Sequence, residues 1–294
     1  MFATCLIGAS NNASNNNFYS WNYAVSIVGG NEPYVWAISN TGNSTPDFDS
    51  ITDFDSISSV DAVGSTPSGI IYLSSNEGSS FSNVNTIPNA IGISAYNQYN
   101  QPNQLYVLNS SGNIYYSSNG GGSFAIVNNI PNAKIIRTCN YPNNLWIVDK
   151  SNNLYYSGNY GSTFTLVHNI PHTVALTSAF DYVYIVDGYG NIHFSGDNGN
   201  TFNTVNKMNN VIGLATEINS NYLYTLDIQG NVHASTDGGN SFTLRGNVPN
   251  PICMMMNYPS NLYVLDSSGT IHHSSNAGAS FTIQGNVPNS VFTI

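Results

Sequence analysis

The chain has 294 residues, and 41% of them are apolar, which suits a folded globular protein and excludes a disordered one. Only 7% of the residues are charged, against roughly 25% in an average protein. Five lysines and arginines against 15 acids give a formal net charge of −10, so the chain lacks the basic surface that binds nucleic acid or an anionic membrane.

The N-terminal residues 1–10 are apolar, but no basic segment precedes them, so we do not interpret them as a signal peptide. No stretch reaches the roughly 18 apolar residues that a membrane span needs. The three cysteines, Cys5, Cys139 and Cys253, are far apart in the sequence. An odd number of cysteines argues against a disulfide framework, so we expect buried free thiols.

Residues 38–45 form an incomplete copy of a motif that recurs later in the chain, S-x-[DN]-x-G-x-[ST]-F. Asn40, Gly42 and Ser44 match it, Thr45 stands in the place of the Phe, and Val35 fits an apolar position before it. A doubled acidic segment follows at residues 47–55. It lacks the Gly turn and the terminal Glu of an EF-hand loop, so we expect a solvated acidic loop and no calcium site.

The full motif then recurs six times, and successive Phe residues are 38 to 43 residues apart. Other positions keep fixed distances from the Phe: a Gly or Asn twelve residues before it and an apolar residue ten residues before it. Five copies have an aromatic residue eighteen before the Phe, and five have a Pro seven after it. The six copies are at residues 74–81, 117–124, 157–164, 195–202, 235–242 and 274–281.

Each repeat is predicted to contain four strands, A to D. In the repeat of Phe124 these are residues 90–96, 104–109, 113–118 and 124–128, and Gly112 allows a tight turn between strands B and C. A sheet of this size has two apolar faces and must stack on its neighbours, so the repeat predicts an all-β fold, a β-propeller. Seven copies predict seven four-stranded blades in a single domain, residues 1–294, with residues 288–294 closing the ring.

The motif resembles the Asp-box, or bacterial neuraminidase repeat, although Asn fills the Asp position in most copies. The resemblance implies a structural hairpin between strands C and D, in which Asx and Ser side chains bond the loop, Gly takes the positive-φ corner and Phe packs between sheets. Propellers with this repeat include sialidases, glycosidases and non-catalytic proteins, so the resemblance indicates fold more than activity. The residues concerned are Asn76, Asn119, Asn159, Asp197, Asp237 and Asn276, Gly78, Gly121, Gly161, Gly199, Gly239 and Gly278, and Phe81, Phe124, Phe164, Phe202, Phe242 and Phe281.

A sialidase would need three arginines around a carboxylate, and the chain has only Arg137 and Arg245. One acidic or amide residue stands fifteen before the Phe in five copies, at the end of strand B. We interpret these residues as caps of the B–C turn; the alternative is a ligand-binding ring of carboxylates on one face. They are Asn109, Asp149, Asp187, Asp227 and Asp266.

Histidines at one repeat position, His193, His233 and His272, lie a blade apart, too far to share one metal ion, and we expect them to pack between blades. His168 and His172 fall in one loop but have no third ligand. We therefore predict no catalytic residues, no metal and no cofactor.

The neutral, amide-rich and hydroxyl-rich surface favours a non-catalytic binding or structural module. We expect a virion-surface or extracellular protein that recognises a glycan or a protein surface, binds no nucleic acid, inserts into no membrane and could assemble into a larger particle or fibre. The alternative is a glycoside hydrolase with an unidentified carboxylate pair.

Overall fold

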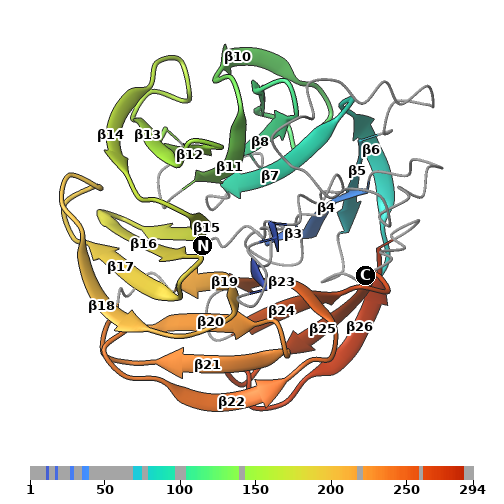
Figure 1. Ribbon diagram of the computed structural model, residues 1–294. Helices are drawn as coiled ribbons and strands as arrows, with labels where there is room; N and C mark the ends of the chain where they lie inside the picture. The colour runs from blue at the N-terminus through green and yellow to red at the C-terminus, as the bar shows by residue number, and fades with distance from the viewer. Residues whose placement is uncertain are drawn as a thin grey trace.

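The computed structural model describes residues 69–74, 79–96, 104–138, 143–216, 221–257 and 261–287, together with the backbone of four short strands nearer the N-terminus. The described residues form an all-β propeller, in which four-stranded sheets radiate from a centre (Figure 1). All neighbouring strands within a sheet are antiparallel, and in the complete repeats each strand is joined to the next by a hairpin or a short connection.

Five blades follow one another as complete repeats, each with strands A to D from the inside outward. The first has β7 (Ala90–Tyr96), β8 (Gln104–Asn109), β9 (Asn113–Ser117) and β10 (Ala125–Asn129). The second has β11 (Ala133–Thr138), β12 (Leu145–Asp149), β13 (Asn153–Ser157) and β14 (Thr165–Asn169). The third has β15 (Thr173–Ala179), β16 (Tyr182–Asp187), β17 (Asn191–Ser195) and β18 (Asn203–Lys207).

The fourth blade has β19 (Val211–Thr216), β20 (Leu223–Asp227), β21 (Asn231–Ser235) and β22 (Thr243–Asn247). The fifth has β23 (Pro251–Asn257), β24 (Asn261–Asp266), β25 (Thr270–Ser274) and β26 (Thr282–Asn286). A further sheet contains β3 (Ile27–Gly29), β4 (Val35–Ser39), β5 (Ile70–Ser74) and β6 (Ser82–Thr86), and β1 (Asn11–Asn12) pairs with β2 (Asn17–Phe18).

The prediction of seven blades is wrong. Within the described part of the chain there are five complete repeats, β7 to β26, and the sheet β3–β6, whose inner strand contacts both β7 and β23 and so completes the ring. Val35 pairs with Ser74, so β4 is the second strand of this sheet. The supposed motif at residues 38–45 therefore follows a B strand, and residues 40–69 connect it to β5 where the other blades have a tight turn. Three matching motif positions arise by chance in a chain so rich in Asn, Gly and Ser. The apolar pattern of a strand also does not distinguish strand B from strand C.

Burial falls from the inner to the outer strands of each blade. In β12 all five residues are buried, because both faces of strand B are covered by neighbouring blades. Strand D is half-exposed and carries a register shift, as between Ile126 and Asn128, that interrupts its pairing. Such bulges protect an outer edge from pairing with other chains.

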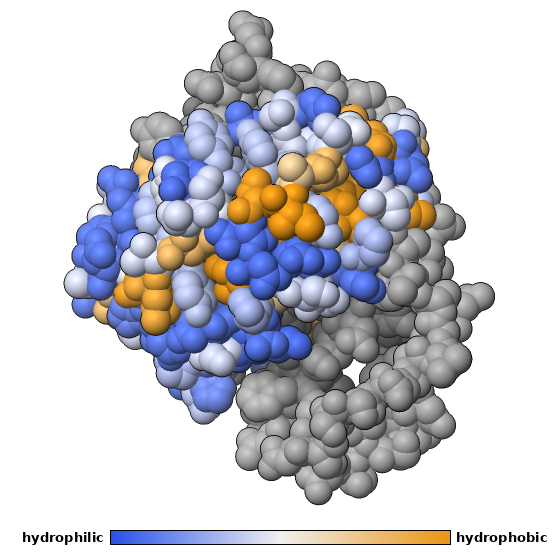
Figure 2. Space-filling view, turned by 90° about the horizontal axis from the view of Figure 1, so that it is seen from above, coloured by the Kyte–Doolittle hydropathy of each residue, from blue (hydrophilic) through white to orange (hydrophobic). Residues whose placement is uncertain are grey.

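In most blades a side-chain amide or guanidinium group of strand D bonds to the C–D loop of the next blade, and we call these bonds the inter-blade contacts. The Asn128 amide donates to the carbonyls of Gly161 (3.0 Å) and Ser162 (2.9 Å). Asn206 bonds in the same way to Gly239 and Asn240 at 3.0 and 2.8 Å. Asn85 and Arg245 also donate to carbonyls of the next blade, and Gln284 donates to Ser79. The asparagines of the outer strands thus have a structural use. Figure 2 shows one side of the molecule, where hydrophobic patches interrupt a hydrophilic surface.

The expectation of free thiols is wrong for Cys253, which is buried and disulfide-bonded. Cys5 and Cys139 lie outside the described residues, as do residues 288–294, which were expected to close the ring, and the acidic segment at 47–55.

Candidate functional site

The two ends of the propeller carry different connections. The B–C turns and D–A loops lie at one end, which we call the top face, and the A–B connections and C–D loops lie at the other, because successive strands are antiparallel. Backbone hydrogen bonds join the connections that share an end. At the top face, Ser110 N of a B–C turn donates to Asn89 O of a D–A loop, and at the other end Asn198 N of a C–D loop donates to Asp181 O of an A–B connection.

The residue that ends strand B caps the B–C turn in every complete repeat. Asp149 Oδ1 accepts a hydrogen bond of 2.9 Å from the backbone N–H of Asn153, four residues later. The same bond is 2.9 Å long in the other four turns, where it joins Asn113 to Asn109, Asn191 to Asp187, Asn231 to Asp227 and Thr270 to Asp266. These residues therefore perform the turn-capping role that Asx side chains commonly have.

The second carboxylate oxygen is bonded as well, to a side chain of strand C six residues later. Tyr155 donates to Asp149 Oδ2 at 3.2 Å, and His193 Nε2 lies 3.1 Å from Asp187 Oδ2. In the last complete repeat, His272 Nε2 lies 2.8 Å from Asp266 Oδ2. His193 and His272 thus bond within their own blade, a partnership that the sequence analysis missed although the constant spacing of six residues signalled it.

Two of the carboxyls have a lowered pKa. Burial raises the pKa of Asp187, but hydrogen bonds from Asn191 and His193 outweigh it, so the pKa lies below its ordinary value. For Asp266, burial is likewise outweighed by bonds from Ser268 and His272. Both carboxyls are therefore ionised at neutral pH and held by their own turn. The structure places one such residue in each complete blade and brings none of them together.

Among the top-face residues that depart from the repeat, four lie together where the blade β11–β14 meets the blade β15–β18. Lys134 is at the bulge of its A strand, where the other complete repeats have Ile or Val. Asn152, with φ 66°, replaces the Gly of the B–C turn. His172, with φ 60°, stands where the other D–A loops have a left-handed Asn, and Tyr189 occupies a B–C turn position that holds Ser or Gln elsewhere.

Lys134 joins the two blades. Its Nζ donates to Asn152 Oδ1 and to the carbonyl of Thr173, both at 2.8 Å, and Asn152 Oδ1 also accepts from the backbone N–H of Thr173 at 3.1 Å. Burial lowers the pKa of the Lys134 ammonium to about 8, against the attraction of Asp149. A bulge is the local feature that can aim such a side chain away from the core.

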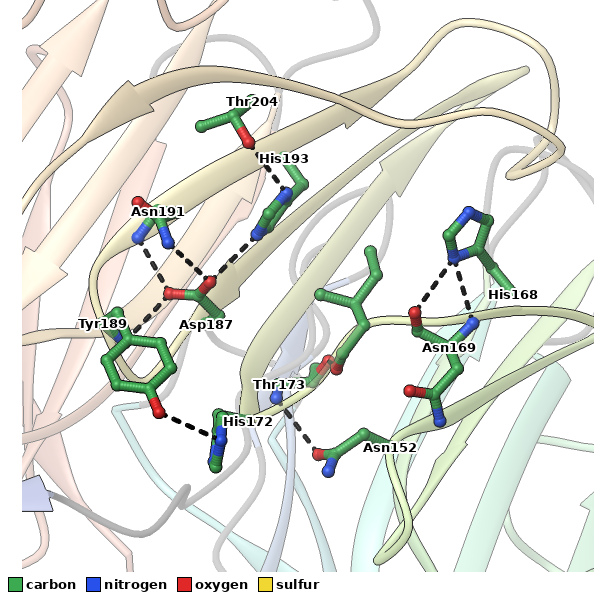
Figure 3. A network of polar contacts seen from close by, with 11 residues as sticks. Asn152, His168, Asn169, His172, Thr173, Asp187, Tyr189, Asn191, His193 and Thr204 are labelled. Carbon is green, nitrogen blue, oxygen red and sulfur yellow. Dashed lines mark hydrogen bonds and ion pairs between the residues drawn. The ribbon is translucent and has the colours of Figure 1, made fainter. Parts of the chain in front are cut away.

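His172 and Tyr189 form a polar aromatic pair beside this junction (Figure 3). Their rings meet edge to face with centroids 4.9 Å apart, and the Tyr189 hydroxyl lies 3.2 Å from His172 Nε2. Tyr189 is 57% exposed, so its ring is available to a partner. His is among the non-Gly residues that adopt a left-handed backbone more often, so it can replace the Asn of this loop position.

The C–D loops at the opposite end are closed by the recurring Ser and Asx residues. In the loop of Asn119, Oδ1 accepts from the backbone N–H of Ser123 at 2.9 Å, while Ser117 Oγ accepts from Gly121 N at 3.0 Å. Asn119 Nδ2 donates to the Ser123 hydroxyl at 3.0 Å. Gly121, with φ 92°, takes the left-handed corner.

Asp replaces Asn in two C–D loops without changing their shape. Asp197 Oδ1 accepts from the Thr201 N–H at 2.9 Å, and Thr201 now donates its hydroxyl to Oδ2 at 2.7 Å. A hydroxyl can donate or accept, so it adapts to either side chain. The bonds from Thr201 and Ser195 lower the pKa of Asp197 to about 2, and those from Ser241 and Ser235 do the same for Asp237.

The Phe that ends each motif packs against buried clusters between blades. Phe124 lies against Ile71 and its cluster, and Phe164 against Tyr106 and its cluster. The B-strand aromatics fill the same spaces: a side chain on Gly199 would meet the Trp146 ring at 2.9 Å. Asn159 and Asn276 bond their loops as Asn119 does, whereas Asn76 and Gly78 lie outside the described residues.

Among the residues that the structure describes, no three His, Cys, Asp or Glu side chains gather as metal ligands would. A search of those same residues finds no helix with the length and apolar character needed to cross a membrane.

No protein-family model matches the sequence, and no curated protein matches it. The fold is similar to YCF48 from Cyanidioschyzon merolae, with a TM-score of 0.53 and 10% identity over 94% of this chain and 90% of that chain. It is also similar to a gluconolactonase from Xanthomonas campestris, with a TM-score of 0.53 and 12% identity over 68% of this chain and 81% of that chain. A GH74 enzyme from Niastella koreensis matches with a TM-score of 0.48 and 17% identity over 98% of this chain and 44% of that one. The first two similarities agree with the class of protein that the structure defines, a β-propeller, and show the fold alone.

Proposed function

We propose that this chain is a non-catalytic binding propeller of the Asp-box type that recognises a neutral glycan at its top face. The observation that carries the proposal is the convergence of Lys134, Asn152, His172 and Tyr189 on one junction between blades. In a repeat protein the shared residues maintain the fold, so residues that break the repeat at one place point to a use particular to that place.

The chemistry of this junction suits a polyhydroxyl ligand. Tyr189 offers an exposed aromatic ring, and the turns around it present amides and hydroxyls that can both donate and accept hydrogen bonds. The capped carboxylates, such as Asp187, support the turns from which these groups project. Both oxygens of the Asp187 carboxylate already accept hydrogen bonds within their own blade. A carboxylate held in this way is poorly placed to exchange a proton with a substrate, which favours a binding function over a catalytic one.

The C–D loops support the assignment to the Asp-box type, because Ser, Asx and Gly close each described loop in the way that the motif resemblance implies. An extracellular or virion-surface setting is part of the proposal. The low charge and the disulfide of Cys253 favour an oxidising compartment.

A glycan array tests the proposal, with variants that restore the residue found in other repeats. Tyr189→Ser and His172→Asn should each keep the fold and weaken glycan binding about tenfold, which corresponds to about 1.4 kcal/mol. Tyr222→Ala, which removes an exposed Tyr at the opposite end, is the matched control and should bind as the wild type does.

A reducing-end assay on every bound glycan should show no cleavage. Cleavage would replace the proposal with a hydrolase, and an array without any binding would refute glycan recognition and leave a protein surface as the partner to test. Equal loss in Tyr189→Ser and Tyr222→Ala would place the binding surface elsewhere.

A further inference from the structure

Arg137 is a buried cation on an inner strand of the propeller. It lies on β11, near the end of the strand opposite the top face, and is 3% exposed. Its side chain crosses to the next blade, where Nε donates to the carbonyl of Leu176 at 2.8 Å, and Nη1 donates to its own neighbour, Ile136 O, at 3.1 Å. The corresponding residues of the other complete repeats are Ser94, Thr177, Ala215 and Met255, so none of these four repeats has a charge at this level.

The guanidinium of Arg137 remains charged at neutral pH. Burial lowers the pKa of Arg137 to about 9, and a guanidinium with that pKa is still protonated at pH 7. In the part of the chain that the structure describes, the ion pairs are those of His193 with Asp187 and His272 with Asp266, and no carboxylate pairs with Arg137. A buried charge without a counter-charge is strongly unfavourable.

The hydrogen-bonding capacity of Arg137 is also only partly used. A guanidinium has five N–H donors, and the two carbonyls accept from Nε and Nη1, which leaves Nη2 for another acceptor. A hydroxyl group lies on the neighbouring inner strand. Ser178, on the face of β15 that meets β11, makes one long bond of 3.5 Å from its Oγ to Thr138 O.

We propose that Arg137 is an anion site, where its guanidinium and the hydroxyl of Ser178 bind a small carboxylate or inorganic oxyanion between β11 and β15. Two oxygens on one anion match the paired donors of a guanidinium, and a charge-assisted bond of this kind is among the stronger polar contacts in proteins. The site lies on the inner strands and is separate from the residues of the proposed glycan site.

Thermal unfolding in acetate and in sulfate, each compared with chloride at constant ionic strength, tests the site. The wild type should show a saturable rise in Tm of about 2–4 °C at ten times the dissociation constant. The acetate and sulfate arms distinguish a carboxylate from a tetrahedral oxyanion. Arg137→Met should abolish the saturable rise, and Arg137→Lys, which keeps the charge but not the paired donors, should weaken it.

Arg245→Met is the matched control, because Arg245 also donates to backbone carbonyls but is exposed. It should retain the full anion response. Sulfate stabilises many proteins by exclusion from their surface, so an equal, unsaturated rise in wild type and Arg137→Met would overturn the proposal.

If Arg137→Met does not fold, crystals of the wild type grown with selenate test the site directly, because selenium can be located by its anomalous scattering. An anomalous peak within hydrogen-bonding distance of the Arg137 guanidinium supports the site. A map from anion-stabilised protein without such a peak overturns it.

Discussion

At the residue scale, the B–C turns show how one position can hold either a carboxylate or an amide. Asn109 accepts the same turn N–H that Asp149, Asp187, Asp227 and Asp266 accept in their own blades. The capping bond needs only one side-chain oxygen, so the negative charge is not required for the turn itself.

Asp227→Asn should therefore change stability little, whereas Asp227→Ala should cost about 1–3 kcal/mol, because it leaves the Asn231 N–H without its buried acceptor. Urea unfolding of both variants measures the difference. A loss in Asp227→Asn as large as that in Asp227→Ala would show that the charge, and not the cap, stabilises the turn.

The two C–D loops with Asp give the molecule a defined acid sensitivity. The pKa values of Asp197 and Asp237 are lowered from 3.8 to about 2, so the folded state prefers their ionised form. This stabilisation is present above the unfolded pKa and is lost as the pH falls from about 4 towards 2. Asp197→Asn with Asp237→Asn, residues native to the other loops, should flatten the decline of Tm in that range. Parallel Tm curves for the variant and the wild type would contradict this origin of the acid sensitivity.

The residue scale also shows what the sequence could and could not predict. The capping role of the aspartates follows from their place before a turn, and the structure shows the expected bonds. The partnership of His193 with Asp187 was within reach, because a constant spacing of six residues across a hairpin places two side chains side by side. The bond of Lys134 to Thr173 could not be predicted, because it joins two different blades. No local sequence pattern indicates that a bulge directs the Lys134 side chain to the next blade.

At the element scale, a blade combines a buried strand B with an outer strand D whose side chains contact the next blade. Strand positions in the complete repeats were predicted closely, since turn residues and apolar alternation are local signals. The strands of the first sheet were not predicted, because residues 40–69 separate its strands B and C where the repeat has a tight turn.

The inter-blade contacts should be measurable one at a time. Asn206→Ala removes two bonds to the next blade and should cost about 1 kcal/mol or more, whereas Asn203→Ala, an exposed residue of the same strand, should stay within about 0.5 kcal/mol of the wild type. Denaturant unfolding monitors both variants. Equal effects would mean that Asn206 contributes only as a strand residue.

At the scale of the whole molecule, the ring is completed by packing between its first and last sheets. Tyr72 of β5 belongs to the same buried cluster as Met254 and Leu262, and Gln284 bonds Ser79 across the same boundary. The number of blades is a global property: it depends on how many sheets fit around the centre. Counting motif copies overestimated it, because one apparent copy belongs to the connection inside a single sheet.

The amide contacts between blades have a consequence for the conditions that the protein tolerates. Most of these bonds join neutral groups, and dissolved ions screen only charges. The melting temperature should therefore vary little between dilute buffer and about 0.5 M sodium chloride, apart from a small contribution of the two His–Asp pairs. A calorimetric series would show a steep salinity dependence if charges held the blades together. A ring held by neutral amide bonds is thus expected to keep its cohesion over a wide range of ionic strength.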